Sequence, residues 1–309
     1  MTAPIIEVQG LTKSYGGKRG IKGVSFDVAE GEVFGFLGPN GAGKTTTIRV
    51  LMALLRGDSG TARIAGHDVW QESVEVKKQV GYLPGELSLD PSLTGGQILE
   101  YLGNLRGGVD KAYVAQLVKR LDLDPNRKFR QYSGGNKRKV GLIQAFMHRP
   151  RLIVLDEPTS GLDPLNQQEF GRMVGEVRDQ GRTVFLSSHF LTEVEQACSR
   201  VAIIREGQIV RIGGLAELKD IKHHEVTITF ADAVPAAEFQ TLDGVEKVEA
   251  LPDGHTLRVT VQGGVDAVIK AAARHSVATL TTHEPSLDDI FLRYYQADGQ
   301  APKEAAGVL

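Results

Sequence analysis

The chain has 309 residues, a length that predicts two domains or one large domain with an appendage. Its 36 Lys and Arg residues nearly balance 38 Asp and Glu residues, and the formal net charge of -2 disfavours functions that need a broadly basic surface, such as non-specific duplex binding. The lone cysteine, Cys198, excludes an intrachain disulfide and a CxxC zinc site, so we expect a reducing, cytosolic setting. No apolar run approaches the ~18 residues of a spanning helix, and residues 1–9 do not resemble a signal peptide. Any work at a membrane is therefore expected to need a partner.

The first two thirds of the chain, from Ile5 to about Gly214, alternate short apolar runs with polar stretches of helical periodicity. Apolar runs followed by turn signals and helical patterns are typical of buried parallel strands in an α/β domain. The clearest are Val33–Leu37, Leu152–Leu155, Val184–Leu186 and Val201–Ile204. Residues 97–147 have mostly helical spacing. We therefore predict an α/β domain over residues 1–217 with a helical subdomain inserted at about 86–150.

A glycine-rich segment follows the first apolar run and precedes a predicted helix over Thr46–Leu55. It fits the pattern G-x-x-x-x-G-K-[ST] at every fixed position, in the strand–loop–helix context that the pattern requires. The residues predicted to bind the nucleotide are Gly38, Pro39, Asn40, Gly41, Ala42, Gly43, Lys44, Thr45 and Thr46. Glycines let backbone N–H groups point at phosphate oxygens, and the helix N-terminus adds its positive end. The Lys44 ammonium is predicted to reach the β- and γ-phosphates, and the Thr45 hydroxyl to ligate Mg²⁺.

Two carboxylates, Asp156 and Glu157, follow the apolar run at residues 152–155. In an open parallel sheet, ligands bind outside the carboxyl ends of the strands. Asp156 is therefore predicted to hold the Mg²⁺ of the nucleotide, directly or through water. Glu157 is predicted to polarise a water molecule for attack on the γ-phosphate. Taken alone, a strand that ends in Asp-Glu is more often a surface cap, so this interpretation depends on the phosphate loop.

Further motifs, in order along the chain, resemble those of ATP-binding cassette (ABC) ATPases. Tyr132-Ser133-Gly134-Gly135-Asn136 resembles the signature motif of that family, which is usually Leu-Ser-Gly-Gly-Gln. Ser160-Gly161-Leu162-Asp163 resembles the D-loop, and His189 resembles the switch histidine after the next strand. Tyr15 stands where the family stacks an aromatic ring on adenine. The resemblance covers residues 5 to about 217.

The resemblance implies ATP with Mg²⁺ as the nucleotide and a P-loop NTPase fold of the ABC type. It also implies that two such domains close head-to-tail, with each ATP between one phosphate loop and the partner's Ser133-Gly134-Gly135. A serine hydroxyl and glycine N–H groups at a helix start can complete a cage around the γ-phosphate. Asp163 is implied to contact the nucleotide, and His189 to act in catalysis beside Glu157. One chain carries one set of motifs, so a dimer is expected.

Two departures from the family pattern concern the same site. After Gly81-Tyr82-Leu83-Pro84 the family continues with the Q-loop glutamine, but Gly85 and then Glu86 stand here. Either Glu86 substitutes for the glutamine, or the contact to the metal is lost. The signature begins with Tyr132 and ends with Asn136, but its Ser-Gly-Gly core is intact, so we expect it to work.

After about Leu218 the pattern changes to short alternating strands. Val226, Ile228 and Phe230 form one set, Leu257, Val259 and Val261 another, and Pro252-Asp253-Gly254 supplies the turn between the second and third strands. A helix near Ala236–Phe239, a helical stripe at Val265, Val268, Ile269 and Ala272, and a strand at Val277–Leu280 complete the order β-α-β-β-α-β. We predict a small ferredoxin-like α+β domain over residues 218–309, with a disordered tail from about 297.

The end of the chain carries one more predicted helix. Ser286 with Asp289 resembles a capping box, and Phe291 and Tyr294 on that helix are predicted either to contact a partner or to pack inside the domain. Residues 285–291 resemble the C-terminal end of ATPase subunits from ABC-2 type exporters, including the daunorubicin-resistance group.

The leading hypothesis is the ATPase subunit of an exporter of drugs or other hydrophobic compounds. It would form a homodimer or pair with a related ATPase, work with separate ABC-2 type permease chains, and lie peripherally on the cytoplasmic face of the cell membrane. Nucleic acid is not an expected partner. One alternative is a soluble ABC ATPase that acts on nucleic acid or ribosomes. Another is a nucleotide-sensing module with little turnover, which the missing Q-loop glutamine favours weakly and Glu157 and His189 oppose.

Overall fold

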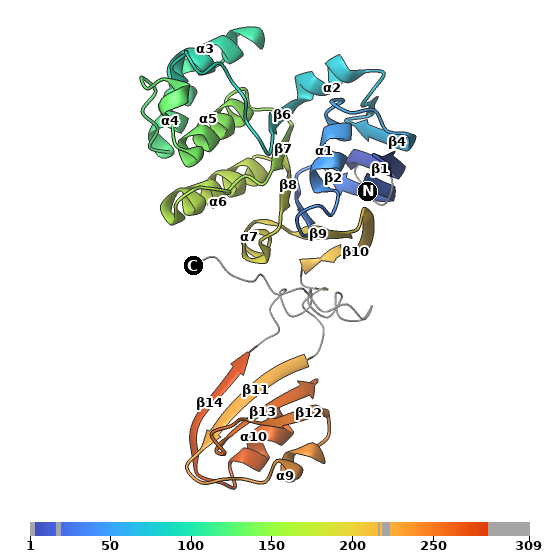
Figure 1. Ribbon diagram of the computed structural model, residues 1–309, viewed down its shortest axis with the longest axis vertical. Coiled ribbons are helices and arrows are strands. Elements are labelled where there is room, and N and C mark those ends of the chain that lie inside the picture. Colours follow the sequence, from blue (N-terminus) through green and yellow to red (C-terminus); the bar gives the residue numbers. More distant parts are fainter. Residues whose placement is uncertain (1–3, 17–19, 216, 218–222, 284–309) are drawn as a thin grey trace. The chain divides into compact units, whose positions relative to one another are not determined.

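The computed structural model describes residues 4–16, 20–215, 217 and 223–283 (Figure 1). Contacts within the chain divide it into two compact units, residues 1–214 and 215–309. The predicted last helix, with Phe291 and Tyr294, and the tail from about 297 lie outside the described residues. Each unit is therefore described by itself, on the residues that the structure places.

The first unit opens with an antiparallel sheet that the sequence analysis did not anticipate. Its strands, in spatial order, are β2 (Gly20–Ala29), β1 (Pro4–Ser14), β4 (Ser59–Ile64) and β5 (His67–Asp68). Val24, Phe26 and Val28 are buried in alternation with exposed neighbours, the period of two that is typical of a strand with one covered face. This alternation was a sequence signal for the sheet.

The second sheet of this unit confirms all four predicted apolar strands. In spatial order it contains β10 (Gln208–Gly214), β9 (Arg200–Arg205), β3 (Val33–Leu37), β8 (Thr183–Ser188), β7 (Leu152–Asp156) and β6 (Val80–Leu83). All neighbouring pairs are parallel except β10 with β9. Every residue of β3, β7 and β8 is buried, which explains why these strands read as continuous apolar runs. The carboxyl ends of β3 and β7 carry the phosphate loop and the acidic pair.

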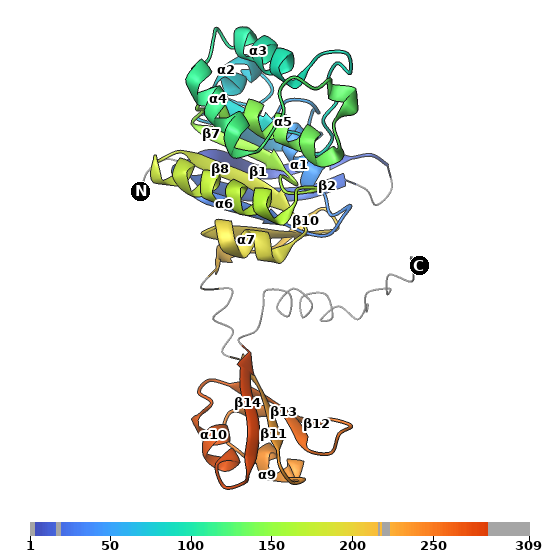
Figure 2. The same ribbon diagram turned by 90° about the vertical axis from the view of Figure 1, so that its left-hand side faces the viewer.

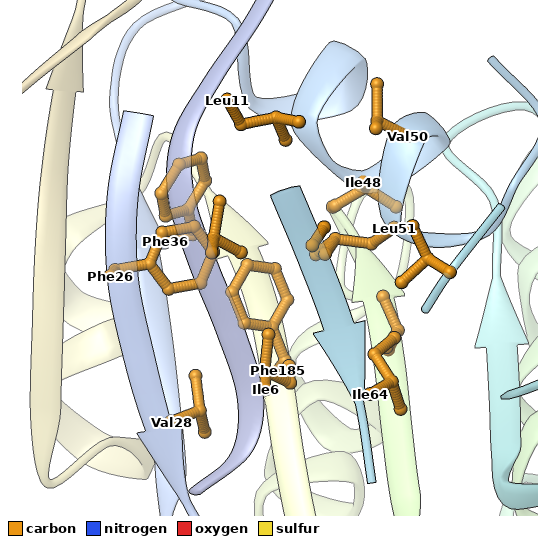
Figure 3. Packing of buried hydrophobic residues seen from close by; sticks show 14 of the residues in the cluster. Ile6, Leu11, Phe26, Val28, Phe36, Ile48, Val50, Leu51, Ile64 and Phe185 are labelled. Atoms are coloured by element: carbon orange, nitrogen blue, oxygen red, sulfur yellow. The ribbon is translucent and has the colours of Figure 1, made fainter. Parts of the chain in front are cut away.

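The hydrophobic core of this unit joins both sheets and α1 (Lys44–Leu51). Phe26, Phe36 and Phe185 lie at its centre, with ring centroids 5.4–5.8 Å apart. Figure 3 shows Ile48 and Leu51 of α1 lying toward Ile64 within the same core.

The helix predicted over Thr46–Leu55 is wrong at both ends. It begins at Lys44 and stops at Leu51, where the chain turns through Ala53 at a φ of 51°.

Helices surround the six-stranded sheet. They are α2 (Ser73–Gln79), α3 (Gly95–Leu105), α4 (Lys111–Arg120), the 3₁₀ turn Phe129–Gln131, α5 (Gly134–Phe146), α6 (Pro164–Asp179) and α7 (Leu191–Ala197). Figures 1 and 2 show α3, α4 and α5 grouped together, with α1 and α6 on opposite faces of the sheet. Leu117 of α4 and Leu121 at its C-cap are buried, which fixes the inner face of this helix.

The second unit contains, within residues 223–283, one antiparallel sheet and two short helices. In chain order these are β11 (His223–Phe230), α9 (Ala236–Gln240), β12 (Val245–Ala250), β13 (Thr256–Gln262), α10 (Asp266–Ala272) and β14 (Val277–His283). The spatial strand order is β12-β13-β11-β14, and the element order is the predicted β-α-β-β-α-β. Phe239 of α9 and Val268 of α10 pack on the strand core, but Ile269, predicted as part of that core, is 43% exposed. The predicted apolar stripe of α10 therefore included one residue, Ile269, that does not belong to the core.

Candidate functional site

A cavity of about 460 Å³ lies against the phosphate loop. It is lined by Tyr15, Gly20, Pro39, Asn40, Gly41, Gly43, Lys44, Thr45, Thr46 and Glu157. Except for Gly20, these are residues that the sequence analysis had selected for nucleotide binding or catalysis. The cavity thus brings together predictions from three separate stretches of sequence.

The phosphate loop has the backbone that its glycines permit. Gly41 and Gly43 have φ values of 81° and 113°, which L side chains rarely adopt, and Gly43 is the N-cap of α1. Gly38 and Ala42 do not line the cavity. A Cβ at Gly38 would clash with the Ile204 carbonyl oxygen, and Ala42 is buried. These two positions therefore let the loop pack against the sheet, while their neighbours face the cavity.

The Lys44 side chain is buried, and protein groups surround its ammonium. Its Nζ donates to the backbone oxygens of Gly38 and Pro39 and lies 3.1 Å from Glu157 Oε1. The last contact brings two opposite charges together, although its geometry is not that of a hydrogen bond. Lys44 and Glu157 therefore neutralise each other across the cavity.

Glu157 is held from three sides in a strained backbone conformation. Its φ of 52° lies in the left-handed region, which costs a non-glycine residue roughly 1–3 kcal/mol and persists where the surroundings impose it. Its N–H donates to Ser187, at 3.1 Å to Oγ and 3.2 Å to the carbonyl oxygen. Its Oε2 lies 2.7 Å from His189 Nδ1. The two predicted catalytic residues are thus in direct contact, from the ends of β7 and β8.

Asp156 is wholly buried behind this pair. Ser187 Oγ donates to its Oδ1 at 2.6 Å, while Oδ2 has no hydrogen-bond partner. A buried carboxylate oxygen without a partner is costly unless a proton, water or cation satisfies it. Thr45 lines the cavity and Asp156 does not, but a hydroxyl and a carboxylate oxygen are the hard oxygen ligands that Mg²⁺ prefers, so the chemistry of these residues fits the metal that the sequence predicts.

The signature segment lies at the start of α5 and does not line the described cavity. Ser133 is the N-cap of α5, and its side chain accepts from the Asn136 N–H at 3.3 Å. Ser133 and Gly134 are exposed, and a Cβ at Gly135 would clash with the Gly161 carbonyl oxygen of the D-loop. An exposed helix start of this kind carries the positive end of the helix dipole and unpaired N–H groups.

Two other predicted ligands have different surroundings. Tyr15 is 53% exposed and lines the cavity, so its ring is open to a planar ligand. Asp163 is the N-cap of α6, where it accepts from the N–H and side-chain amide of Asn166. These hydrogen bonds lower the pKa of Asp163 and keep its carboxylate charged.

The sequence analysis missed several residues of the site. Ser187 contacts both carboxylate residues, and its place directly before Ser188-His189 was the only signal for it. Glu193 of α7 accepts from Thr159 and from Ser188 at 2.8 Å, which links the loops after β7 and β8. The contacts of Ser187 and Glu193 do not follow from local sequence, because they join residues on different elements.

A loop between a parallel strand and a helix, with an acidic strand end beside it, defines a P-loop nucleoside triphosphatase. A family model described as ABC transporter matches residues 21–160. The daunorubicin/doxorubicin resistance ATP-binding protein DrrA of Streptomyces peucetius is 34% identical over 97% of this chain and 96% of its own length. The chain therefore belongs to the ABC transporter family, as an ATP-binding subunit with ATPase activity.

Solved structures agree with this assignment. One, described as the ATP binding subunit of an ABC transporter, is 28% identical, with a TM-score of 0.64 over 70% of this chain and 92% of that chain. A dimeric bacterial ABC transporter cassette has a TM-score of 0.62 at 22% identity, over 68% of this chain and 98% of its own, and shares the fold. Within the described residues, the helices are too short or too polar to cross a bilayer.

Proposed function

We propose that this protein is the ATP-hydrolysing subunit of an exporter and that it works as a head-to-tail dimer. One observation carries the proposal: the cavity contains Lys44 and Glu157, while Ser133 and Gly134 lie exposed elsewhere on the chain. A site that surrounds a phosphate on one side only needs a second surface to complete it. The exposed start of α5 on a second copy has the chemistry to do so.

ATP binding, in this proposal, replaces the internal partners of Lys44. The triphosphate takes the ammonium from Glu157 and from the loop carbonyls, and the loop N–H groups bind phosphate oxygens. Tyr15, half exposed at the cavity, stacks on the adenine ring. Thr45 and Asp156 Oδ2 would hold Mg²⁺, which when bound neutralises phosphate charge.

Glu157, once released from Lys44, acts as the general base toward the attacking water. The 2.7 Å contact with His189 Nδ1 holds its carboxylate, and the two hydrogen bonds that its N–H donates to Ser187 hold its backbone. In this proposal His189 orients Glu157 through that contact. Ser133-Gly134-Gly135 of the second copy donates to the γ-phosphate, and Asp163, held at the start of α6, is proposed to contact the nucleotide as well.

The transport role rests on the relatives. The Streptomyces peucetius protein is named for resistance to daunorubicin and doxorubicin, and this chain matches it over nearly all of its length. We therefore propose that the dimer drives efflux of hydrophobic, drug-like compounds through separate ABC-2 type membrane subunits. Its place would be the cytoplasmic face of the cell membrane, bound to those subunits.

The test is Glu157→Gln in the full-length protein. We expect ATP turnover to fall about 10²–10⁴-fold, because general-base assistance is lost. ATP binding should become tighter than in the parent, because the neutral amide no longer competes for Lys44. Analytical ultracentrifugation with ATP and Mg²⁺ should then show a stable dimer.

Ser133→Ala is the matched control for the second surface. It should leave ATP binding to the isolated chain within about twofold, while dimerisation and turnover fall, because it removes one donor from the junction. Parental turnover in Glu157→Gln would remove Glu157 from the mechanism. A loss of ATP binding by the monomeric Ser133→Ala chain would contradict action across the dimer.

A further inference from the structure

The outer edge of β6 is covered by side chains rather than by another strand. β6 is the last strand of its sheet, so every second carbonyl group points away from β7. The carbonyls of Val80 and Tyr82, and that of Pro84 just after the strand, each accept from a side chain in or next to α3 and α5. The donors are Arg106 and His148 for Val80, Gln144 for Tyr82, and Arg138 for Pro84. We call this row the edge ladder. Two of its donors, Arg138 and Gln144, belong to α5.

The α5 helix can approach β6 this closely because each of the two elements places a glycine against the other element. A Cβ at Gly81 would clash with the Ala145 carbonyl oxygen, and one at Gly141 would clash with Leu83. Strand and helix are therefore fixed to each other by close packing as well as by hydrogen bonds. Movement of α5 without β6 would break both.

Arg138 occupies the end of the edge ladder nearest the site. Its Nη1 donates to the Pro84 carbonyl at 2.8 Å and lies 3.5 Å from the Asp156 carbonyl, and its Nη2 donates to the Gly85 carbonyl at 2.8 Å. One planar guanidinium thus holds two successive carbonyls of the loop after β6 and reaches the end of β7. Burial lowers the pKa of Arg138, while the charges of Asp156 and Glu157 raise it.

The loop that Arg138 holds lies directly against the unpartnered oxygen of Asp156. A Cβ at Gly85 would lie 3.0 Å from Asp156 Oδ2, which is closer than side chains normally allow. Glu86, the next residue, is exposed. The position where the family resemblance would place a glutamine therefore contributes backbone alone, held from behind by Arg138.

We propose that Arg138 is a positioning residue that fixes the loop at residues 84–85 against Asp156 and thereby joins the helix that starts with the signature segment to the catalytic carboxylates of its own subunit. This deepens the proposed function and rests on it. Ser133, at the N-cap of α5, would act on the nucleotide of the second copy, while Arg138, five residues further along the helix, acts on the site of its own copy. The two ATP sites of a dimer would then be linked through α5.

The test compares Arg138→Gln, Arg138→Lys and Gln144→Met in the full-length chain. Gln144→Met is the matched control, because it removes a donor from the same edge ladder at Tyr82, away from Asp156. For Arg138→Gln we expect kcat to fall about 10- to 100-fold, as a displaced site does, with ATP affinity of the monomer unchanged within about twofold. Hydrogen exchange in residues 84–90 should become faster. Arg138→Lys should recover part of kcat, since it can hold one carbonyl.

The outcomes separate the inference from the function on which it rests. If the parent chain bound ATP without hydrolysing it, the proposed function would fail. If the parent turned over ATP and Arg138→Gln matched it, or if Gln144→Met lost as much kcat as Arg138→Gln, the positioning role would be overturned. Faster exchange in the loop with parental kcat would overturn it as well.

A second variant applies if Arg138→Gln does not fold. Gly85→Ala displaces the same loop from the opposite side, through contact with Asp156 Oδ2. It should lower kcat, raise the Mg²⁺ concentration needed for half-maximal turnover several-fold, and leave the melting temperature near that of the parent. Parental kcat and Mg²⁺ dependence in Gly85→Ala would also overturn the role of the loop.

Discussion

The two units bury polar groups to very different extents. Among the described residues of the first unit nine polar side chains are buried, and five of them lie at or beyond the carboxyl ends of β3, β7 and β8: Lys44, Asp156, Thr159, Ser187 and Ser188. In the described part of the second unit, Thr256 is the one buried polar side chain, and it donates to Asp253 in an adjacent turn. Burying polar groups costs free energy unless partners satisfy them. The first unit therefore accepts a cost in folding free energy in order to hold the polar groups of the nucleotide site.

The largest expected effect is on ATP affinity, when a buried polar residue of the first unit is removed. Lys44→Ala removes the cation that faces Glu157 and the phosphates, so ATP affinity should fall about 10- to 100-fold, as expected for lost charge-assisted hydrogen bonds. Equilibrium dialysis measures it, with Lys78→Ala, an exposed lysine of α2, as control. If both variants bound ATP like the parent, the phosphate-loop assignment would be wrong.

Removing the second unit tests whether nucleotide binding depends on the first unit alone. A chain that ends at Gly214 retains every described cavity residue and its own core, so ATP affinity should stay within about twofold of the parent. Self-association or assembly with membrane subunits should weaken, because we expect the non-catalytic unit to stabilise that assembly. Analytical ultracentrifugation with ATP and Mg²⁺ decides this. A dimer as tight as that of the full chain, with normal recovery of the membrane subunits, would refute it.

The smallest expected effect is a pH dependence of the stability of the first unit. Burial, and then the nearby Arg106, lower the pKa of His148 from 6.5 to about 4. Between these values the unfolded chain binds a proton that the folded chain does not, so the stability of the first unit should fall as the pH drops from about 6.5 to about 4.

His148→Gln keeps an amide donor for the Val80 carbonyl without this titration. Its melting temperature should fall less on acidification, by on the order of 2–4 °C once solvent screening is allowed for. Calorimetry of the first unit at pH 7 and pH 5 gives the difference. Equal losses in variant and parent would assign the acid sensitivity to other groups.

The sequence predicts best the parts of the fold that depend on local order. The phosphate loop, its flanking strand and the acidic end of β7 follow from residue spacing, because the same backbone that fixes the spacing presents the groups. The strands of the second unit follow from their alternation. The end of α1 at Leu51 does not, since it depends on how the following turn fits the core.

Contacts between distant segments could not be predicted. The hydrogen bonds of Ser187 to Asp156 and of Arg138 to Gly85 join residues 31 and 53 positions apart, and only the sheet order brings them together. Tyr15 and Glu157 were selected separately by motif, and the cavity unites them. The sequence therefore named the residues of the site more successfully than their partners.

The internal pairing of Lys44 has a consequence for ligand selection. An anion that enters the cavity must take the ammonium from Glu157 and from the Gly38 and Pro39 carbonyls at the same time. The phosphate oxygens of a nucleotide can replace all three partners, because several of them can reach one ammonium. We therefore expect the entry of a nucleotide and the release of the Glu157 carboxylate from Lys44 to occur in the same step.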